Sequence, residues 1–330
     1  MKIAKAVILA DSVGHGQAWP AVATGSKHLF PVANRPILFH HLESLHRAGL
    51  LEATIVADPA ARDAIKSAVG DGRRWKLSVR YEQCTAGGGL SGALAACRSF
   101  IGEEPVLVQQ ADALLSGRLS PYITAFSDER LDAMALRVIP GHAPSPIELP
   151  SGYLLSPRAL ALLVDSPDAA VDPIDGVRGS GGRVRVQSVD GCLPCHGDID
   201  ALLECNRRML EQLEGDAAGA VLEDSEIQGH VIVHHSAEVR RTMLRGPLII
   251  GPAARLTDAY VGPYSSIGAN VTIEGAEIEH SIVLPGAALS FVGTRIESSV
   301  IGEGARIARA FRKPSSLRMS IGNGAEVLLS

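Results

Sequence analysis

The segment that organises this chain reads Lys27-His28-Leu29-Phe30-Pro31-Val32-Ala33-Asn34-Arg35-Pro36-Ile37-Leu38. Behind it, apolar residues recur at helical spacing, at Leu38, Leu42, Leu45 and Leu50. Pro36 suits the first position of a helix, where its missing N–H costs nothing, and Gly49 is a typical stop signal. The segment therefore predicts a loop with one lysine that leads into an amphipathic helix.

Working outward, short apolar runs alternate with helical patterns over the first two thirds of the chain. We expect strands at 6–10, 52–58, 77–81, 105–112, 131–139 and 184–189. Helices are expected at 60–69, at 90–97 and up to Leu213. This alternation is typical of a doubly wound, mostly parallel sheet, a Rossmann-like α/β domain that we place at residues 1–216. Ligands of such sheets bind outside the carboxyl ends of the strands.

The last third has a different period. Aliphatic–glycine pairs such as Ile250-Gly251 and Ile267-Gly268 recur, and aliphatic residues step by six from Val261 to Ile267 to Ile273. Hexapeptide spacing of this kind indicates a left-handed parallel β-helix, in which each flat side buries one aliphatic residue per coil. We expect it at 227–330, after a linker of small residues at 217–226.

Composition narrows the functional classes. The 330 residues are 46% hydrophobic and 20% charged with a net charge of −5, so no basic footprint favours nucleic acid or an anionic membrane as a partner. The apolar run at 6–10 is too short for a signal sequence or a membrane span, which predicts a cytoplasmic protein. Five cysteines, an odd number, indicate free thiols and no disulfide framework.

The lysine followed by Leu29, Pro31-Val32 and Asn34-Arg35-Pro36 resembles the signature of sugar-1-phosphate nucleotidylyltransferases. The C-terminal third resembles the tail of one branch of this family, the long form of glucose-1-phosphate thymidylyltransferases. Its matching stretches are 245–247, 258–268, 277–284 and 294–302. The resemblance covers nearly the whole chain and implies an α/β domain that transfers a nucleotidyl group, followed by a β-helix.

The resemblance also implies site residues. Lys27 matches the family's lysine, and Asp112 matches the aspartate that binds Mg²⁺ to neutralise phosphate charge. We expect both to be catalytic, although Asp112 could also be a solvated acid or the cap of a helix. Ala10 and Gly14 match the frame of the phosphate loop. Gln83 and Gly88 match the positions that contact the nucleobase. Alternatively, Gly88 and its neighbouring glycines only shape the turn between a strand and a helix.

Several family positions are altered here. Asp11 and Ser12 replace paired glycines, no arginine clamp follows them, and the lysine that contacts the sugar phosphate has no counterpart. Cys195 takes the place of the second metal-binding aspartate, a role that Asp198 or Asp200 could assume. The arginine, the second aspartate and the lysine are thus three lost contacts with the transition state. If each loss raised the activation free energy by about 3 kcal/mol, the sum of about 9 kcal/mol would lower the rate about a millionfold. The penalty is smaller where the three groups act as a unit.

Two functions therefore stay open. The first is a divergent enzyme that converts a nucleoside triphosphate and a sugar 1-phosphate into a nucleoside diphosphate sugar and pyrophosphate. The second is a non-catalytic relative that binds a nucleotide, a sugar nucleotide or a partner subunit. In either case the β-helix offers a surface for a homo-oligomer.

Two further patterns have alternative explanations. Cys192-x-x-Cys195-His196 matches a redox or haem-attachment pattern, although coincidence is the commoner explanation of such a spacing. His234 and His235 could include the base of a hexapeptide acyltransferase, although histidines in a solvated turn are commoner.

Overall fold

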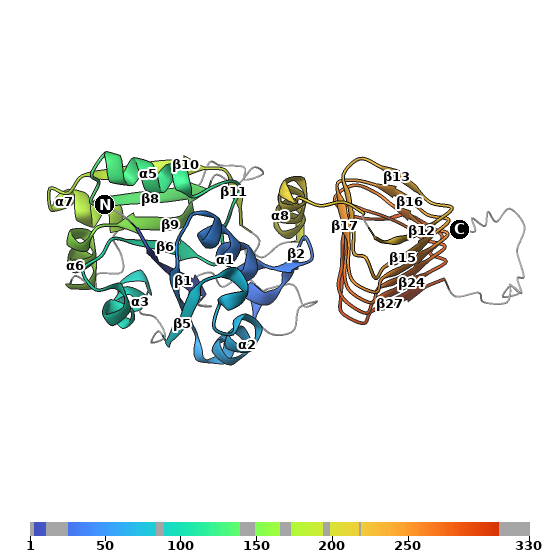
Figure 1. Cartoon of the computed structure of the whole chain (residues 1–330), viewed down its shortest axis with the longest axis horizontal. Coiled ribbons are helices and arrows are strands. Elements are labelled where there is room, and N and C mark those ends of the chain that lie inside the picture. Colours follow the sequence, from blue (N-terminus) through green and yellow to red (C-terminus); the bar gives the residue numbers. More distant parts are fainter. Residues whose placement is uncertain are drawn as a thin grey trace, which may run out of the picture.

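The computed structural model describes residues 3–10, 26–83, 89–138, 149–165, 173–193, 199–217 and 219–309. Within them the chain forms an α/β domain and a β-helix, and helix α8 (Ile199–Gln212) stands between the two (Figure 1). No helix in these ranges is long and apolar enough to cross a membrane.

The α/β domain is built on one twisted sheet. In the described residues it has seven strands in the order β10-β8-β9-β6-β1-β4-β5. They are β1 (Lys5–Ala10), β4 (Glu52–Ala57), β5 (Ser78–Gln83), β6 (Val106–Gln110), β8 (Ala133–Val138), β9 (Leu149–Leu155) and β10 (Val184–Val189). Only β9 among them runs antiparallel to its neighbours. The predicted doubly wound, mostly parallel sheet is confirmed.

Helices cover both faces of this sheet. On one face lie α1 (Ile37–Arg47), α2 (Pro59–Val69), η2 (Arg73–Trp75) and α5 (Ser120–Asp128), which share an apolar core with the sheet. On the other lie α3 (Gly89–Ala96), α4 (Arg98–Ile101), α6 (Pro157–Asp165) and α7 (Pro173–Gly179). Each face of the sheet is therefore covered, which is why inner strands such as β1 and β6 read as continuous apolar runs, whereas the edge strands β5 and β10 are partly exposed.

The segment after Lys27 differs in detail from its prediction. A short helix, η1 (Lys27–Leu29), is followed by a hairpin of β2 (Pro31–Val32) and β3 (Arg35–Pro36). Pro36 thus ends a strand and caps α1, one position before the helix begins. The apolar stripe of α1 is confirmed, since Leu38, Leu42 and Leu45 are fully buried. The hairpin was missed because two-residue strands carry almost no periodic signal.

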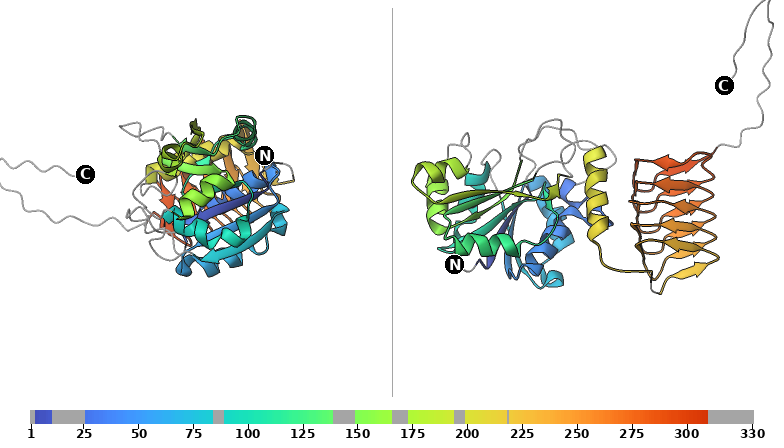
Figure 2. Two further views of the ribbon diagram at one scale, coloured as in Figure 1. Left: turned by 90° about the vertical axis from the view of Figure 1, so that its left-hand side faces the viewer. Right: turned by 90° about the horizontal axis from the view of Figure 1, so that it is seen from above.

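Three parallel sheets make up the β-helix (Figure 2). The first contains β12 (Val221–Glu223), β15 (Glu238–Arg240), β18 (Arg255–Thr257), β21 (Thr272–Glu274), β24 (Ala288–Ser290) and β27 (Arg306–Ala308). The second contains β13 (Glu226–Gln228), β16 (Met243–Arg245), β19 (Tyr260–Val261), β22 (Glu277–Glu279) and β25 (Ile296–Glu297). The third contains β14 (Val231–Val233), β17 (Leu248–Ile250), β20 (Ser266–Ile267), β23 (Ile282–Val283) and β26 (Val300–Ile301).

The predicted inward-facing residues of the β-helix are confirmed. Val261, Ile267 and Ile273 are fully buried in one continuous apolar column. Each coil pairs with the next, as Val221 does with Glu238 and Glu238 with Arg255, a repeat of roughly three hexapeptides. The first coil begins with β12, which lies inside the stretch 217–226 that the sequence analysis treats as a linker, and β13 starts at its last residue.

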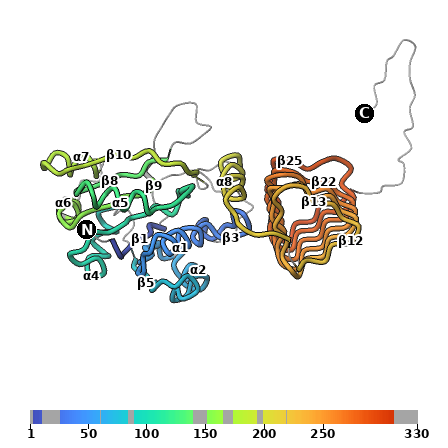
Figure 3. The backbone as a smooth tube through the Cα atoms, turned by 45° about the horizontal axis from the view of Figure 1, so that its top comes forward, coloured from blue at the N-terminus to red at the C-terminus, as the bar shows by residue number. Residues whose placement is uncertain are grey.

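A separate apolar cluster joins the two domains. It combines Val32 and Ile37 of the hairpin and α1, Leu202 and Met209 of α8, and residues of the third β-helix sheet such as Ile282. The tube in Figure 3 shows α8 beside β2 and β3 on one side and the coils on the other. The hairpin behind Lys27 is therefore placed close to the β-helix.

Candidate active site

Lys27 and Asp112 meet at the carboxyl edge of the sheet. The Lys27 Nζ atom lies 2.7 Å from Asp112 Oδ2, and the two side chains are 19% and 30% exposed. Lys27 begins η1, and Asp112 follows β6 by two residues, so different elements deliver the two groups. The structure thus brings together the two residues that the sequence analysis predicts to be catalytic, although their roles stay predictions.

Histidines surround the buried side of this pair. His28 Nδ1 lies 3.3 Å from Asp112 Oδ1, and the His28 side chain is only 1% exposed. Behind it, His41 Nε2 lies 3.3 Å from the Ala111 carbonyl oxygen, which can only accept a hydrogen bond. Burial lowers the pKa of His41 to about 4, because the charged imidazolium would lose its hydration there. His41 is therefore a neutral donor that supports the backbone next to Asp112.

Ala10 and Gln83 lie on the same edge of the sheet. Ala10 pairs with Ala57, and Ala57 pairs with Gln83, so the three residues form one row across β1, β4 and β5. Ala10 is buried and Gln83 is exposed. The Gln83 amide stands at a strand end, as the nucleobase contact requires, and its contact with a base stays a prediction.

Asp200, the alternative residue for the second metal position, is exposed in the first turn of α8, whereas the other predicted site residues lie outside the described ranges. They are Gly14 of the phosphate loop, Gly88 of the base-binding turn and Asp198 of the second metal position. Cys195, the partner of Cys192 in the possible redox pattern, is also outside, whereas Cys192 is buried in the two-residue strand β11 (Gly191–Cys192). Strand β11 pairs with β7 (Leu114–Leu115), just after Asp112.

Asp112 fits one ligand position for magnesium. Its Oδ1 atom is buried and accepts no hydrogen bond from the described part of the chain. Magnesium bound with a nucleotide takes one or two protein carboxylates, with phosphate and water oxygens completing its shell. No cluster of three or more His, Cys, Asp or Glu side chains able to hold a metal occurs among the described residues. A single carboxylate that awaits a metal–phosphate complex is consistent with this donor set.

The histidine pair of the β-helix lies in a turn. The rings of His234 and His235 have centroids 4.2 Å apart, and His234 Nδ1 lies 2.9 Å from Ser236 Oγ. His235 is exposed. These contacts are local to the turn, as expected for solvated histidines, and they give no support to acyl transfer.

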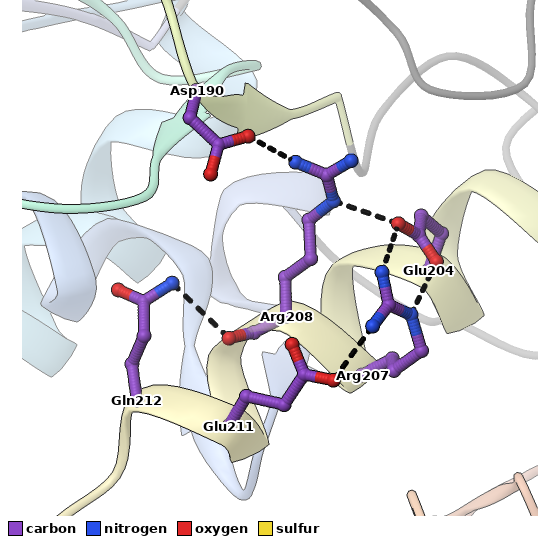
Figure 4. Close-up of polar contacts among 6 residues, drawn as sticks. All are labelled: Asp190, Glu204, Arg207, Arg208, Glu211 and Gln212. Carbon is purple, nitrogen blue, oxygen red and sulfur yellow. Dashed lines mark hydrogen bonds and ion pairs between the residues drawn. The ribbon is translucent and has the colours of Figure 1, made fainter.

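Helix α8 carries polar residues to which the sequence analysis gave no role. Glu204 accepts two hydrogen bonds of 2.7 Å from Arg207 and one of 2.7 Å from Arg208, which also pairs with Asp190 (Figure 4). The Arg207 guanidinium lies 5.8 Å from the ring centroid of Tyr264 in the β-helix. The ion pairs within α8 could have been predicted from the sequence, because opposite charges spaced three and four residues apart lie on the same face of a helix. The contact with Tyr264 depends on the tertiary fold and has no such signal.

Comparison with known proteins agrees with this architecture. A family model described as nucleotidyl transferase matches residues 5–146. A glucose-1-phosphate thymidylyltransferase of Streptomyces griseus is 33% identical over 99% of both chains. A protein of the same description from Streptomyces antibioticus is 27% identical over 98% of this chain and 99% of its own.

Solved structures share the fold of the α/β domain. A Bacillus anthracis protein described as a glucose-1-phosphate thymidylyltransferase superposes with a TM-score of 0.54 at 20% identity, over 64% of this chain and 96% of its own. The family model defines the α/β domain as that of a nucleotidyltransferase. The relative that is 33% identical over nearly the full length shows that the chain belongs to the sugar-1-phosphate nucleotidylyltransferase family.

Proposed function

We propose that this protein transfers a nucleotidyl group from a nucleoside triphosphate to a sugar 1-phosphate. The observation that carries the proposal is the pairing of Lys27 with Asp112 at the carboxyl edge of the sheet, in a chain whose family relatives are aligned almost end to end. The phosphate oxygen of the sugar would form a bond to the α-phosphorus. The bond from that phosphorus to the bridging oxygen would break, and pyrophosphate would leave with the electron pair.

In this proposal the Lys27 ammonium binds a phosphate oxygen of the triphosphate. It would exchange its present partner, Asp112, for the substrate. Asp112, with Asp198 as the second candidate, would hold Mg²⁺, which supplies positive charge against the phosphates. The Gln83 amide offers one donor face and one acceptor, which suits the edge of a nucleobase. Positioning and charge neutralisation are then the main sources of catalysis.

The proposed reaction also bears on where in the cell the protein acts. Both substrates are anionic metabolites of the cytoplasm, so a cytoplasmic location is part of the proposal. An assembly of several copies through the β-helix stays a prediction.

The test is a pyrophosphate-release assay on the full chain, with common nucleoside triphosphates and sugar 1-phosphates, in Mg²⁺ and in a chelator. Lys27→Met and Asp112→Asn should each lower kcat/KM by about a hundredfold to a thousandfold, because each removes one charge from the transition state. Lys66→Met and Asp63→Asn are matched controls on the exposed side of α2 and should leave the rate unchanged.

Two results would contradict the proposal. Release that does not depend on Lys27 and Asp112 would place the chemistry elsewhere. No release with any substrate pair, together with nucleotide binding in calorimetry, would favour the non-catalytic alternative. The assay tests this alternative because several residues of the family signature are altered in this chain, Asp11 and Cys195 among them.

A further inference from the structure

The hairpin behind Lys27 ends in a tight turn that faces the β-helix. Ala33 and Asn34 form its tip with φ angles of 50° and 58°, both in the left-handed region. The backbone N–H of Ile37 donates to the Phe30 carbonyl at 3.0 Å, which closes the base of the hairpin next to η1. Phe30 is 4% exposed, and it follows η1 directly. A displacement of the tip would therefore reach Lys27 through a short and tightly packed segment.

Asn206 of α8 holds this tip. Its Oδ1 atom accepts a hydrogen bond from the Ala33 backbone N–H at 2.8 Å and another from Ser266 Oγ at 2.7 Å. Its Nδ2 atom donates to the Tyr264 carbonyl at 2.9 Å. Asn206 is fully buried. One side chain thus connects the hairpin, α8 and a coil of the β-helix.

A second contact joins the hairpin directly to the same coil. Asn34 Nδ2 donates to the Ile267 carbonyl at 2.7 Å. Apolar side chains enclose these bonds on the hairpin, α8 and the coils, among them Phe30, Val32, Leu202, Cys205, Ile282 and Leu284. Asn34 is half-buried, whereas the bonds that Asn206 accepts are fully buried, where hydrogen bonds are strong and hard to replace by water.

Only an asparagine satisfies all three partners of residue 206. An aspartate would lose the donor to Tyr264 and would bury a charge, and an apolar residue would leave the Ala33 N–H, the Ser266 hydroxyl and the Tyr264 carbonyl without a bond. This pattern differs from ordinary packing because both polar atoms of the Asn206 side chain have defined partners outside α8, on the hairpin and on one coil of the β-helix.

We propose that Asn206 is a positioning residue through which the β-helix fixes the hairpin that follows Lys27 and, through it, the short helix η1 on which Lys27 lies. The β-helix is then part of the support of the active site, although the described contacts place none of its residues on Lys27 or Asp112. This inference rests on the proposed function, because positioning matters for catalysis only if Lys27 binds the substrate.

The first experiment measures steady-state kinetics of Asn206→Ala, Asn34→Gly and Gln212→Ala. Glycine at position 34 removes the amide while keeping the left-handed φ without strain. Gln212 is the matched control, an exposed amide on α8 whose side chain donates, within the described part of the chain, to the Arg208 carbonyl alone. Misplacing a group that contacts substrate costs up to about a hundredfold, so kcat/KM should fall about tenfold or more in Asn206→Ala, less in Asn34→Gly, and not in Gln212→Ala.

The same substitution in a Lys27→Met background separates positioning from general damage. If Asn206 acts through Lys27, then Asn206→Ala should lower kcat/KM in the native chain and leave it unchanged in Lys27→Met. An equal loss in both backgrounds would overturn the proposal, and so would native kcat/KM in Asn206→Ala. If Asn206→Ala does not fold, as judged by circular dichroism, then Asn34→Gly is combined with Lys27→Met and the same two outcomes decide.

The second experiment needs no activity, so it distinguishes failure of this inference from failure of the proposed function. Hydrogen exchange is followed by mass spectrometry in a peptide that spans 29–36. The Ala33 amide should exchange faster in Asn206→Ala than in the native chain or Gln212→Ala. Unchanged exchange would overturn the inference even if the native chain is active. Faster exchange in a chain without activity would confirm the anchoring of the hairpin and count against the proposed function alone.

Discussion

At the scale of single residues, the site is an ion pair with two possible competitors. Lys27 and Asp112 neutralise each other in this structure at 2.7 Å. A polyphosphate would compete with Asp112 for the ammonium, and a divalent cation would compete with Lys27 for the carboxylate. Binding of the nucleotide and binding of the metal should therefore favour each other, since each one releases the group that the other needs.

The neutral histidine behind the pair makes stability depend on pH. The pKa of His41 falls from 6.5 to about 4 on folding, with burial as the main cause. As the pH drops below 6.5, the unfolded chain binds the proton and the folded chain does not, so stability is complete above 6.5 and decreases toward pH 4. Relative to a pH well above 6.5, the free energy of unfolding is lower by about 2 kcal/mol at pH 5 because of His41.

Urea unfolding at pH 7.5 and pH 5.0 measures this loss. His41→Gln keeps a side-chain donor for Ala111 but does not titrate, so the variant should lose less stability between the two pH values than the native chain. His46→Gln changes an exposed histidine of the same helix and should behave like the native chain. The same pH dependence in all three proteins would show that His41 does not control it.

At the scale of elements, α8 connects the two domains by packing against both of them. Its apolar side packs on the hairpin and the coils, while Glu204 gathers Arg207 and Arg208 on its polar side (Figure 4). Hydrogen bonds from Arg207 are the main cause that lowers the pKa of Glu204 to about 2. The contribution of Glu204 to stability is therefore present above its ordinary pKa of 4.5 and is lost as the pH falls toward 2.

Replacing the Glu204 carboxylate should destabilise α8 and its contacts with both domains. We expect Glu204→Gln to lower the free energy of unfolding at pH 7 by about 1–2 kcal/mol, because the amide cannot serve both arginines as a charged acceptor. Glu211→Gln is the control, since the ion pair of Glu211 among the described residues is with Arg207 alone and its side chain is 41% exposed. It should cost less than about 0.5 kcal/mol. Equal losses in urea unfolding would show that the network contributes no more than a surface ion pair.

At the scale of the whole molecule, the two domains differ in how far they depend on each other. The apolar column of the β-helix consists entirely of its own residues, from Ala217 to Ala305. The cluster around the hairpin and α8 is shared, because Ile282 and Leu284 complete it.

Truncation tests this asymmetry. A fragment of residues 1–216 would expose the α8 face that Ile282 and Leu284 now cover. We expect it to bind a hydrophobic dye, to associate in size-exclusion chromatography and to melt at a lower temperature than the full chain. The complementary fragment 217–330 should keep its β-sheet signal in circular dichroism. A monomeric 1–216 fragment with the native melting temperature would show that the domains are independent.

The sequence indicates the candidate site residues to different degrees, and their roles stay predictions. Asp112 stands out because it ends the apolar run at 105–112, and Lys27 because it precedes a recognisable motif. His28 and His41 were not assigned a role, because a histidine in an apolar stretch carries no sign of what it faces in space. The hairpin at 31–36 was read as a loop, since two-residue strands have no period.

The sequence by itself determined the two architectures and their order along the chain, because buried strands, amphipathic helices and six-residue repeats each leave a periodic pattern of apolar residues. Only the tertiary structure decided that the Lys27 hairpin lies against the β-helix with Asn206 between them. Ala33, Asn206 and Ser266 are far apart in sequence, and hydrogen bonds among such residues arise from packing, which no local period encodes.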